Sequence, residues 1–368
     1  ERSDTCEVER LARCDEEIAG TSDMLCTCHS GAAAGEPGAS PGGATPTWPA
    51  FEANDTCLSF LVIGDAGSRG STQRRVAAAL ARVADELQPT FVALVGDNIY
   101  GDGAEEDPQL IVEFWRDVYL PHRSLNRPWY VVTGNHDWHT DARTERDFTT
   151  HPSNTGGWWR MPHFWYKRSF STLSLTADVF FLDTQIWKGS SLAESVLGRA
   201  IGEEQIAWFR SELAASTADW KVALGHHPVY SAGSHGTTEV LLEELDPILR
   251  EFGVHAYFNG HDHNKQLIQF EGMNYVTSGA GGLSPRSRSY EEPEDSLRHL
   301  LLNPGFASLR MCDAATSELM FYGEAGERQA VEVLSGAPPA APTGAGPSGR
   351  RRRRRRASLL QAPAQRSP

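Results

Sequence analysis

Residues 58–100 read LSFLVIGDAGSRGSTQRRVAAALARVADELQPTFVALVGDNIY, and this stretch decides the fold class. The apolar run at 58–63 is typical of a buried strand, and FVALV at 91–95 is typical of a second one. Between them, residues 71–87 carry apolar side chains at the spacing of a helix. A strand, a helix and a strand in this order predict a βαβ unit.

The rest of the central region continues this alternation of apolar runs and helical patterns. It ends in short strands of hairpin type, so the sequence predicts an α/β fold with mixed sheets. Further helices are expected at Pro108–Tyr119, Gly202–Ala215 and Thr237–Phe252. Further strands are expected at Trp129–Thr133, Val179–Leu182, Val222–Leu224, Ala256–Asn259, Gln266–Phe270, Asn274–Ser278, Ala307–Cys312 and Glu318–Tyr322.

Two segments rich in Gly, Ala, Ser, Pro and Thr, at 29–50 and 336–349, flank the central region. Such segments cannot bury enough apolar surface to offset the entropy of ordering them, so we interpret them as linkers. A run of seven Arg follows at 350–356 and is expected to lie in a disordered, solvated tail. The predicted divisions are a Cys-bearing N-terminal extension with its linker at 1–57, a central domain at 58–325 and a tail at 326–368.

The chain is acidic, since 34 Lys and Arg against 48 Asp and Glu give a formal net charge of −14. Eight of the Arg lie in residues 350–368, where no acid occurs, so the remainder has 26 basic against 48 acidic side chains and a charge of −22. A body of this charge repels nucleic acid, and no nucleic-acid partner is expected. No stretch approaches the roughly 20 apolar residues of a membrane span, so no span is expected either.

Cysteine usage and a glycosylation sequon indicate an oxidising, secretory route. Four of the six Cys lie in the first 28 residues, and the others are Cys57 and Cys312. Clustered Cys in a short polar segment favour disulfides over a zinc site, but the sequence does not choose among the possible pairings. Asn54-Asp55-Thr56 fits the sequon for N-glycosylation. We therefore expect a secreted or lumenal protein of the extracellular, vacuolar or lysosomal space.

Metal-binding side chains recur directly after the predicted strands, each beside a glycine. In an open α/β sheet, sites form at the carboxyl ends of strands, so segments far apart in sequence converge there. The adjoining glycines let the backbone turn sharply. Five such motifs occur in order, namely Gly64-Asp65-Ala66-Gly67, Gly96-Asp97-Asn98-Ile99-Tyr100, Gly134-Asn135-His136-Asp137, Gly225-His226-His227-Pro228 and Gly260-His261-Asp262-His263.

A single Gly-Asp pair after a strand, such as the one at Asp65, is more often a turn in which the Asp caps a helix. Five motifs in order outweigh that interpretation. Together they offer two carboxylates, one phenol, one amide oxygen and three imidazoles, which is the kind of ligand set that two adjacent cations need. The sequence therefore predicts a binuclear metal centre, whose cations supply local positive charge to an otherwise acidic protein.

The order of Asp, Asp with Tyr, Asn-His-Asp, His and His-x-His resembles the calcineurin-like metallophosphoesterases. Over about residues 58–324 the chain is most similar to their purple acid phosphatase branch, and especially to the small tartrate-resistant enzymes of mammalian type. Gly67 stands where many relatives carry a His ligand, and Tyr100 would take over that role. The resemblance implies Fe(III) at one metal position, because a phenolate suits a trivalent cation. It also implies a four-layer α/β/β/α sandwich of two mixed sheets with flanking helices.

The resemblance implies a ligand role for each motif by position. It favours His226 over its neighbour His227, because the family's ligand directly follows the glycine of this motif, and His227 remains the alternative. The implied set is Asp65, Tyr100 and His263 on Fe(III), Asn135, His226 and His261 on a divalent Fe, Zn or Mn ion, and Asp97 bridging both metals.

Two further histidines match substrate-side residues of the family. His136 follows the predicted ligand Asn135, and His235 lies in SAGSHG at 231–236. The implied protein is a secreted acid phosphatase that acts on small phosphate monoesters. A metal-bound hydroxide would attack phosphorus in line, and His136 or His235 would assist the departing alcohol as general acid.

Other functions would use the same residues. The substrate could instead be a phosphodiester or a nucleotide pyrophosphate. An iron pair near solvent could also serve peroxidative redox chemistry. An inactive scaffold would be favoured by missing ligands, and none is missing from the motifs. The complete ligand set together with substrate-side histidines favours hydrolysis over redox chemistry.

Overall fold

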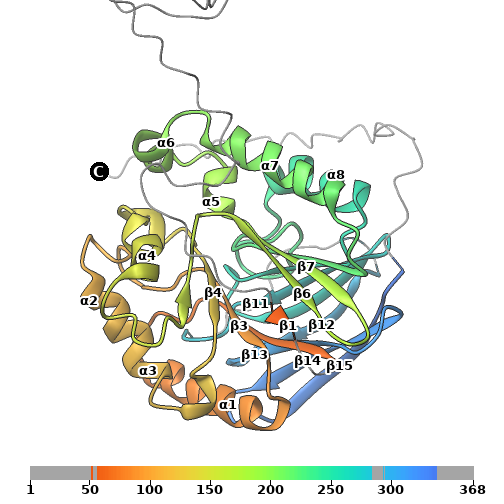
Figure 1. The fold of residues 1–368 in the computed structure, drawn as a ribbon, viewed down its shortest axis with the longest axis horizontal. Helices are drawn as coiled ribbons and strands as arrows, with labels where there is room; N and C mark the ends of the chain where they lie inside the picture. The colour runs from red at the N-terminus through yellow and green to blue at the C-terminus, as the bar shows by residue number, and fades with distance from the viewer. Residues whose placement is uncertain (1–50, 53–55, 284–292, 294, 338–368) are drawn as a thin grey trace, which may run out of the picture. The chain divides into compact units, whose positions relative to one another are not determined.

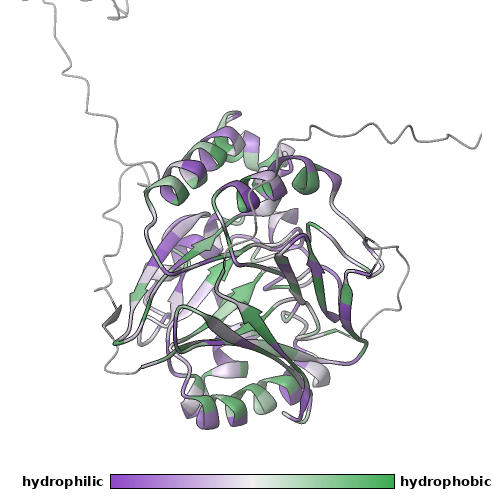
Figure 2. Ribbon diagram, turned by 90° about the vertical axis from the view of Figure 1, so that its right-hand side faces the viewer, coloured by the Kyte–Doolittle hydropathy of each residue, from purple (hydrophilic) through white to green (hydrophobic). Residues whose placement is uncertain are grey.

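Two mixed β-sheets lie between layers of helices (Figure 1). The computed structural model describes residues 51–52, 56–283, 293 and 295–337. In Figure 2, the strands of the inner layers are largely hydrophobic, whereas the helices carry hydrophilic residues as well. This layering confirms the predicted α/β class and the sandwich of two mixed sheets with flanking helices.

The first sheet is built around the predicted βαβ unit. In spatial order its strands are β15 (Arg328–Ser335), β14 (Thr316–Gly323), β13 (Gly305–Met311), β2 (Leu58–Ile63), β3 (Phe91–Val95), β4 (Trp129–Val132) and β5 (Trp159–Arg160). Strands β2 to β5 are parallel, and β13 to β15 continue the sheet in antiparallel pairing. The carboxyl ends of β2 to β5 therefore all lie at the same edge of the sheet.

The second sheet also has a parallel centre. In spatial order its strands are β1 (Phe51–Glu52), β6 (Tyr166–Ser171), β7 (Thr176–Phe181), β8 (Trp220–Leu224), β9 (Ala256–Asn259), β11 (Met273–Ser278), β10 (Lys265–Phe270) and β12 (Leu297–Leu301). Strands β7, β8, β9 and β11 run parallel. Strand β6 pairs antiparallel with β7 and parallel with the short β1, while β10 pairs antiparallel with both β11 and β12. Side chains that follow β8 and β9 therefore also meet at one edge.

Helices cover the outer face of each sheet (Figure 1). Helix α1 (Ser71–Leu87) buries its apolar stripe, including Val76 and Leu80, on the first sheet. On the second sheet, α7 (Ile201–Ala215) places the ring of Phe209 5.5 Å from that of Phe180 in β7. The other helical segments are α2 (Pro108–Ile111), a π-helical turn (Val112–Arg116), α3 (Asp117–Tyr119), α4 (Arg143–Asp147), α5 (Thr184–Trp187), α6 (Ser191–Leu197), α8 (Glu239–Glu251) and 3₁₀ turns at Arg123–Leu125, Asp137–His139 and Phe148–Thr150.

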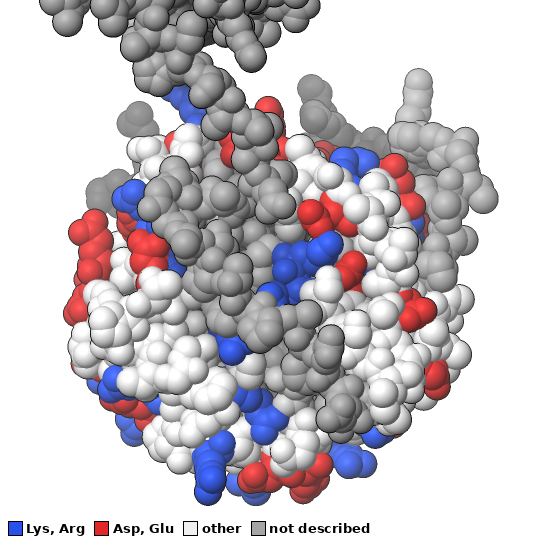
Figure 3. Space-filling model, in the orientation of Figure 1, with Lys and Arg blue, Asp and Glu red and all other residues white. Residues whose placement is uncertain are grey.

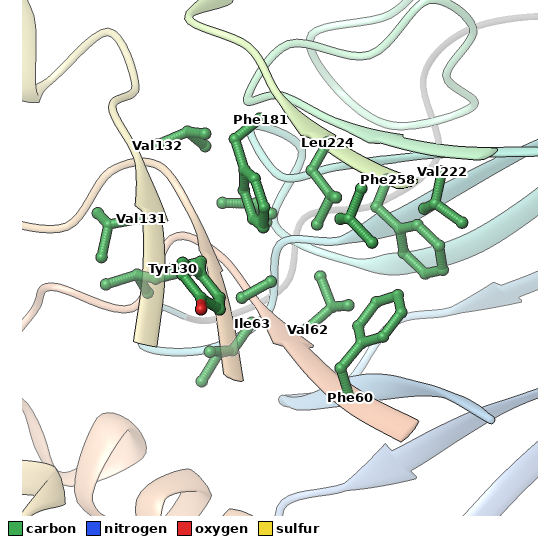
Figure 4. Packing of buried hydrophobic residues seen from close by; sticks show 14 of the residues in the cluster. Phe60, Val62, Ile63, Tyr130, Val131, Val132, Phe181, Val222, Leu224 and Phe258 are labelled. Atoms are coloured by element: carbon green, nitrogen blue, oxygen red, sulfur yellow. The ribbon is translucent and has the colours of Figure 1, made fainter. Parts of the chain in front are cut away.

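A core of aromatic and branched side chains lies between the two sheets (Figure 4). Phe60 of β2 stacks on Phe91 of β3 with ring centroids 4.7 Å apart, and its ring lies 5.9 Å from that of Phe258 in β9. Phe91 also contacts Phe170 of β6 and Phe181 of β7. Burial of one such side chain contributes about 1.5–3 kcal/mol. This core therefore fixes the strand ends of one sheet relative to those of the other.

Most predicted elements are present within one or two residues of their expected bounds, including the βαβ unit of β2, α1 and β3. The predicted end of the central domain at 325 needs correction, because β15 continues the first sheet to Ser335. In β15, Val331 pairs with Met320 of β14, so this segment belongs to the sheet and not to the tail. Its alternating pattern, RQAVEVLS, directly precedes the Ala- and Pro-rich segment, from which the sequence alone did not separate it.

Cys57 and Cys312 form a disulfide that joins the start of β2 to the end of β13, a pairing that the sequence left open. The other four Cys, Asn54 of the sequon, the Arg run, the whole first linker and most of the second lie outside the described residues. Among the described helices, none combines the length and the apolar character that crossing a membrane requires. Acidic and basic side chains are interspersed on the face drawn in Figure 3.

Candidate metal centre

The five predicted motifs converge at the carboxyl ends of parallel strands from both sheets. Asp65 follows β2, Asp97 follows β3 and Asn135 follows β4 in the first sheet, whereas His226 follows β8 and the His-x-His motif follows β9 in the second. Ligand atoms of Asp65, Asp97 and His226 lie within 4.8 Å of one another. The motifs therefore form one site where the two sheets meet.

One half of the site consists of three donor atoms, two oxygens and one nitrogen. The phenol oxygen of Tyr100 lies 3.1 Å from Oδ1 of Asp65 and 3.1 Å from Nε2 of His263. That Nε2 lies 3.6 Å from the same Asp65 oxygen. Carboxylate, phenol and imidazole atoms at this mutual distance have the composition and spacing of the ligands of one cation.

The other half surrounds Nε2 of His226. This atom lies 3.3 Å from Oδ1 of Asp97, 3.2 Å from Oδ1 of Asn135 and 3.3 Å from Nδ1 of His261. The donor set is two imidazoles, one carboxylate and one amide oxygen, which suits a divalent first-row metal. The seven predicted ligand residues thus gather into two adjoining groups.

Three of these residues have left-handed backbone conformations, which non-glycine residues rarely adopt. The φ angles are +54° at Asp65, +53° at Asp97 and +68° at His261. Close packing accompanies this strain, since a Cβ at Gly134 would lie 2.3 Å from Oδ1 of Asp97, and a Cβ at Gly260 would lie 2.4 Å from Oδ2 of Asp65. Strain of this kind typically concentrates at functional sites, where the surrounding structure sustains it.

Two buried carboxylates lie close together at this site. Asp65 and Asp97 are 0% and 2% exposed. Burial raises the pKa of Asp65 well above its ordinary value, and the charge of Asp97 raises it further, although the backbone N–H of His261 opposes the shift. Burial also raises the pKa of Tyr100 and lowers that of His261. Cations at this position would relieve the repulsion between the carboxylates, so the residues present fit metal ions.

A hydrogen bond fixes the tautomer of His226. Its Nδ1 lies 2.9 Å from the carbonyl oxygen of Val95, which can only accept. Nδ1 therefore carries the proton, and Nε2 presents its lone pair to the second group of donors. A backbone carbonyl that orients a histidine in this way is a common partner of metal-binding imidazoles.

The neighbouring His227 has the opposite arrangement. Oγ1 of Thr184 accepts the backbone N–H groups of His226 and His227 at 3.2 and 2.9 Å, so its own hydrogen is donated to Nδ1 of His227 at 2.9 Å. Nε2 of His227 then carries the ring proton and has no lone pair for a metal. Although His226, His227 and His261 lie close enough to share an ion, these hydrogen bonds favour His226 as the ligand.

Gly67 has no room for the His that many relatives carry at this position. A Cβ built there would lie 2.0 Å from the backbone oxygen of Asn98. The backbone N–H of Tyr100 donates to the carbonyl oxygen of Gly67 at 2.8 Å. The phenol thus arrives on a loop that packs directly against residue 67, consistent with Tyr100 serving in place of a histidine.

The two histidines that the sequence predicts on the substrate side border the donor groups from different loops. The backbone N–H of His136 donates to Oδ1 of Asp97 at 3.0 Å, and its Nδ1 lies 3.1 Å from the carbonyl oxygen of Gly101. The exposed ring of His235 lies 4.3 Å by centroid from the ring of His261. Both side chains can therefore reach a molecule bound at the two donor groups.

Several residues that support these donors were not predicted from the sequence. The carboxylate of buried Asp137 accepts the backbone N–H groups of Asn98, Ile99 and Gly134 at 2.7–3.2 Å and so fixes the loops after β3 and β4. Its place in the Gly-Asn-His-Asp motif was the available signal. His139 adds a further contact, since its Nδ1 lies 3.2 Å from the Gly101 oxygen that His136 also approaches.

Comparisons with known proteins show which families the chain is similar to. The sequence profile of calcineurin-like phosphoesterases matches residues 58–265. The chain is 32% identical to tartrate-resistant acid phosphatase type 5 of Rattus norvegicus over 240 residues, which is 61% of this chain and 72% of that protein. It is 33% identical to purple acid phosphatase 3 of Arabidopsis thaliana over 291 residues, 73% of this chain and 75% of that protein.

Solved structures share the fold at lower sequence identity. GAP50, the anchor in the inner membrane complex of Plasmodium, superposes with a TM-score of 0.68 at 24% identity and covers 76% of this chain and 89% of its own. Purple acid phosphatase PPD1 from yellow lupin (Lupinus luteus) seeds has a TM-score of 0.56 at 14% identity, with 76% of this chain and 54% of its own covered. At these identities the likeness concerns the fold alone.

Proposed function

Because the chain belongs to the calcineurin-like phosphoesterase family and is a metal-dependent hydrolase, we propose that it is a binuclear acid phosphatase acting on small phosphate monoesters. The observation that carries this proposal is the pair of adjoining donor groups at the strand ends, each with the composition of a metal site. The similarity to acid phosphatases supports the choice of substrate class.

The residues present fit a mixed metal pair. Phenolate and carboxylate are hard anionic donors, whereas imidazole and amide oxygen suit a divalent ion. In this proposal Asp65, Tyr100 and His263 would hold Fe(III), Asn135, His226 and His261 would hold divalent Fe, Zn or Mn, and Asp97 would contact both.

Two adjacent cations lower the pKa of bound water and offset the charge of a phosphate group. The chain itself orients the ester and manages the proton. Since Nδ1–H of His136 is held by the carbonyl oxygen of Gly101, Nε2 is the ring atom that can carry a transferable proton. When the bond between phosphorus and the ester oxygen breaks, that proton or one from His235 would pass to the departing alcohol.

The proposed location is the secretory pathway or the exterior of the cell. The Cys57–Cys312 disulfide supports it, because such bonds persist in oxidising compartments.

A substrate comparison tests the proposed function. Protein reconstituted with iron and zinc is assayed at mildly acidic pH on 4-nitrophenyl phosphate, ethyl phosphate, bis(4-nitrophenyl) phosphate and ATP. We expect kcat/KM for the monoesters to exceed that for the diester by about tenfold or more. Asp97→Asn should nearly abolish turnover, because it removes the charge shared by both donor groups. Normal activity in that variant, or a preference for the diester, would overturn the proposal.

A further inference from the structure

Asp262 stands between the two histidines of the His-x-His motif, yet its carboxylate contacts a different segment, the loop at 231–235. Oδ1 accepts the backbone N–H of His235 at 2.8 Å and the hydroxyl of Ser234 at 3.4 Å. Oδ2 accepts the hydroxyl of Ser231. Three donors of one loop therefore end on a single carboxylate.

The donor and acceptor roles in this network are determined by its geometry. Oγ of Ser231 accepts Nε2–H of Gln266 at 2.7 Å and the backbone N–H of Gly233 at 2.9 Å, so its own hydrogen is donated to Asp262. Oε1 of Gln266 accepts the backbone N–H of Ala232 at 3.0 Å. The Asp262 carboxylate thus acts as the acceptor in all three of its bonds to the loop.

The loop and the carboxylate are in direct contact. Asp262 is 0% exposed, and a Cβ built at Gly233 would lie 2.3 Å from its Cγ. The ring of His235 at the end of the loop lies 4.3 Å by centroid from the ring of His261 and 6.3 Å from that of His263. Asp262 thus joins the backbone of a substrate-side histidine to the backbone that carries two predicted metal ligands.

We propose that Asp262 is a positioning residue, which holds His235 at the place beside His261 where its imidazole contacts a phosphate group or the departing alcohol. This inference rests on the proposed function, because it takes His235 to be a substrate-side residue. Asp262 itself touches neither metal nor substrate in this role. The ligand that His235 would contact is a phosphate monoester or the inorganic phosphate that hydrolysis releases.

A double-mutant cycle on phosphate binding tests the inference without relying on turnover. The amide introduced by Asp262→Asn places a donor against the donors of the loop, so the loop should shift and His235 with it. Isothermal titration calorimetry on the metal-loaded protein measures the Kd of inorganic phosphate. We expect Asp262→Asn and His235→Ala each to weaken binding, and the double variant to bind no more weakly than His235→Ala alone.

Kinetics give a second readout that separates positioning from general damage. An alkyl leaving group needs a proton, whereas 4-nitrophenolate leaves without one. We expect Asp262→Asn to lower kcat for ethyl phosphate by about 10–100-fold and that for 4-nitrophenyl phosphate by less than about threefold. His235→Ala should show the same contrast between the two substrates. Adding Asp262→Asn to His235→Ala should not lower kcat further.

Asp178 supplies a matched control, because its buried carboxylate also accepts two serine hydroxyls, from Ser169 at 2.5 Å and Ser216 at 2.6 Å. It lies within β7, outside the metal-binding loops, so Asp178→Asn should leave phosphate binding and the leaving-group contrast unchanged. Additive effects of Asp262→Asn and His235→Ala, or loss of metal from Asp262→Asn alone, would overturn the inference. If phosphate binds but no monoester is cleaved, the proposed function fails while the binding cycle still reports on Asp262.

Discussion

Nδ1 of His226 lies 2.9 Å from the carbonyl oxygen of Val95, so Nε2 is the ring atom that can bind a cation. The adjacent His227 is held by the hydroxyl of Thr184 in the opposite tautomer. Two consecutive histidines, which the sequence alone scarcely separates, are therefore distinguished by their hydrogen-bond partners.

This contrast predicts unequal effects of two matched substitutions. His226→Asn should release about one of the two metal ions, because it removes a donor that lies near three others. His227→Asn should retain both ions and most of the activity. Both variants are compared with the wild type by metal content, measured by inductively coupled plasma mass spectrometry, and by kcat/KM. Equal loss of metal from the two variants would show that the hydrogen bonds to Val95 and Thr184 do not select the ligand.

The buried pair Asp65 and Asp97 predicts a conflict between stability and metal binding. In the metal-free protein, Asp65→Asn removes a carboxylate whose pKa is raised by burial and by Asp97. We expect the free energy of unfolding of the metal-free variant to rise by roughly 1–3 kcal/mol. The metal-loaded variant should instead be less stable than the metal-loaded wild type. Urea denaturation with and without chelator measures both, and a destabilised metal-free variant would contradict the prediction.

Asp183 predicts a defined pH dependence of stability. Burial raises its folded-state pKa from 3.8 to about 6. Below about pH 4 the carboxyl is protonated in both the folded and the unfolded state, so no charge is buried. Above about pH 6 it is ionised in both states, and the full free-energy cost of burying the charge applies. The stability it contributes therefore falls by about 3 kcal/mol as the pH rises through this window.

Comparing wild type with Asp183→Asn isolates this contribution. The difference in unfolding free energy between the two proteins should shift by about 3 kcal/mol in favour of the variant between pH 4 and pH 7. Denaturant titrations at several pH values provide the measurement. A difference that stays constant across this range would mean that Asp183 is not buried as an acid in the folded protein.

Gly67 predicts a steric effect in the loop that precedes Tyr100. Gly67→Ala would place a methyl group 2.0 Å from the backbone oxygen of Asn98, so the backbone must move. We expect a loss of about 1–3 kcal/mol of stability. Gly70→Ala is the control, because a Cβ there meets only the side chain of Ser68, with the hydroxyl at 3.2 Å. Thermal melts of the two variants should differ accordingly, and similar melting temperatures would contradict this packing of residue 67.

The fold could be predicted where hydrophobic patterns are continuous. The runs at 58–63 and 91–95 form buried strands because every residue in them faces an apolar layer. Strand β6 reads YKRSFS and fully buries only Tyr166 and Phe170, so its pattern resembles that of a polar loop. The exposed edge strand β15 was missed for the same reason. Such strands form through pairing with neighbours that a local pattern does not specify.

The site could be predicted as far as its residues follow strands in recognisable motifs. All seven predicted ligand residues lie in the two donor groups, because the strand ends bring them together. Thr184 could not have been predicted, since it lies 42 residues from the His226 backbone that it contacts and belongs to no motif. Asp262 was visible within its motif, but its contact with the loop at 231–235 depends on tertiary packing.

The proposed mixed metal centre is best tested by the visible absorption spectrum of the iron- and zinc-loaded protein, with and without Tyr100→Phe. The phenol oxygen of Tyr100 lies 3.1 Å from both Asp65 and His263, so it would bind Fe(III) as a phenolate. We predict a broad charge-transfer band in the visible region that disappears in the variant. A phosphatase that is fully active without iron and without this band would contradict the mixed metal centre and indicate a phosphoesterase with two divalent ions.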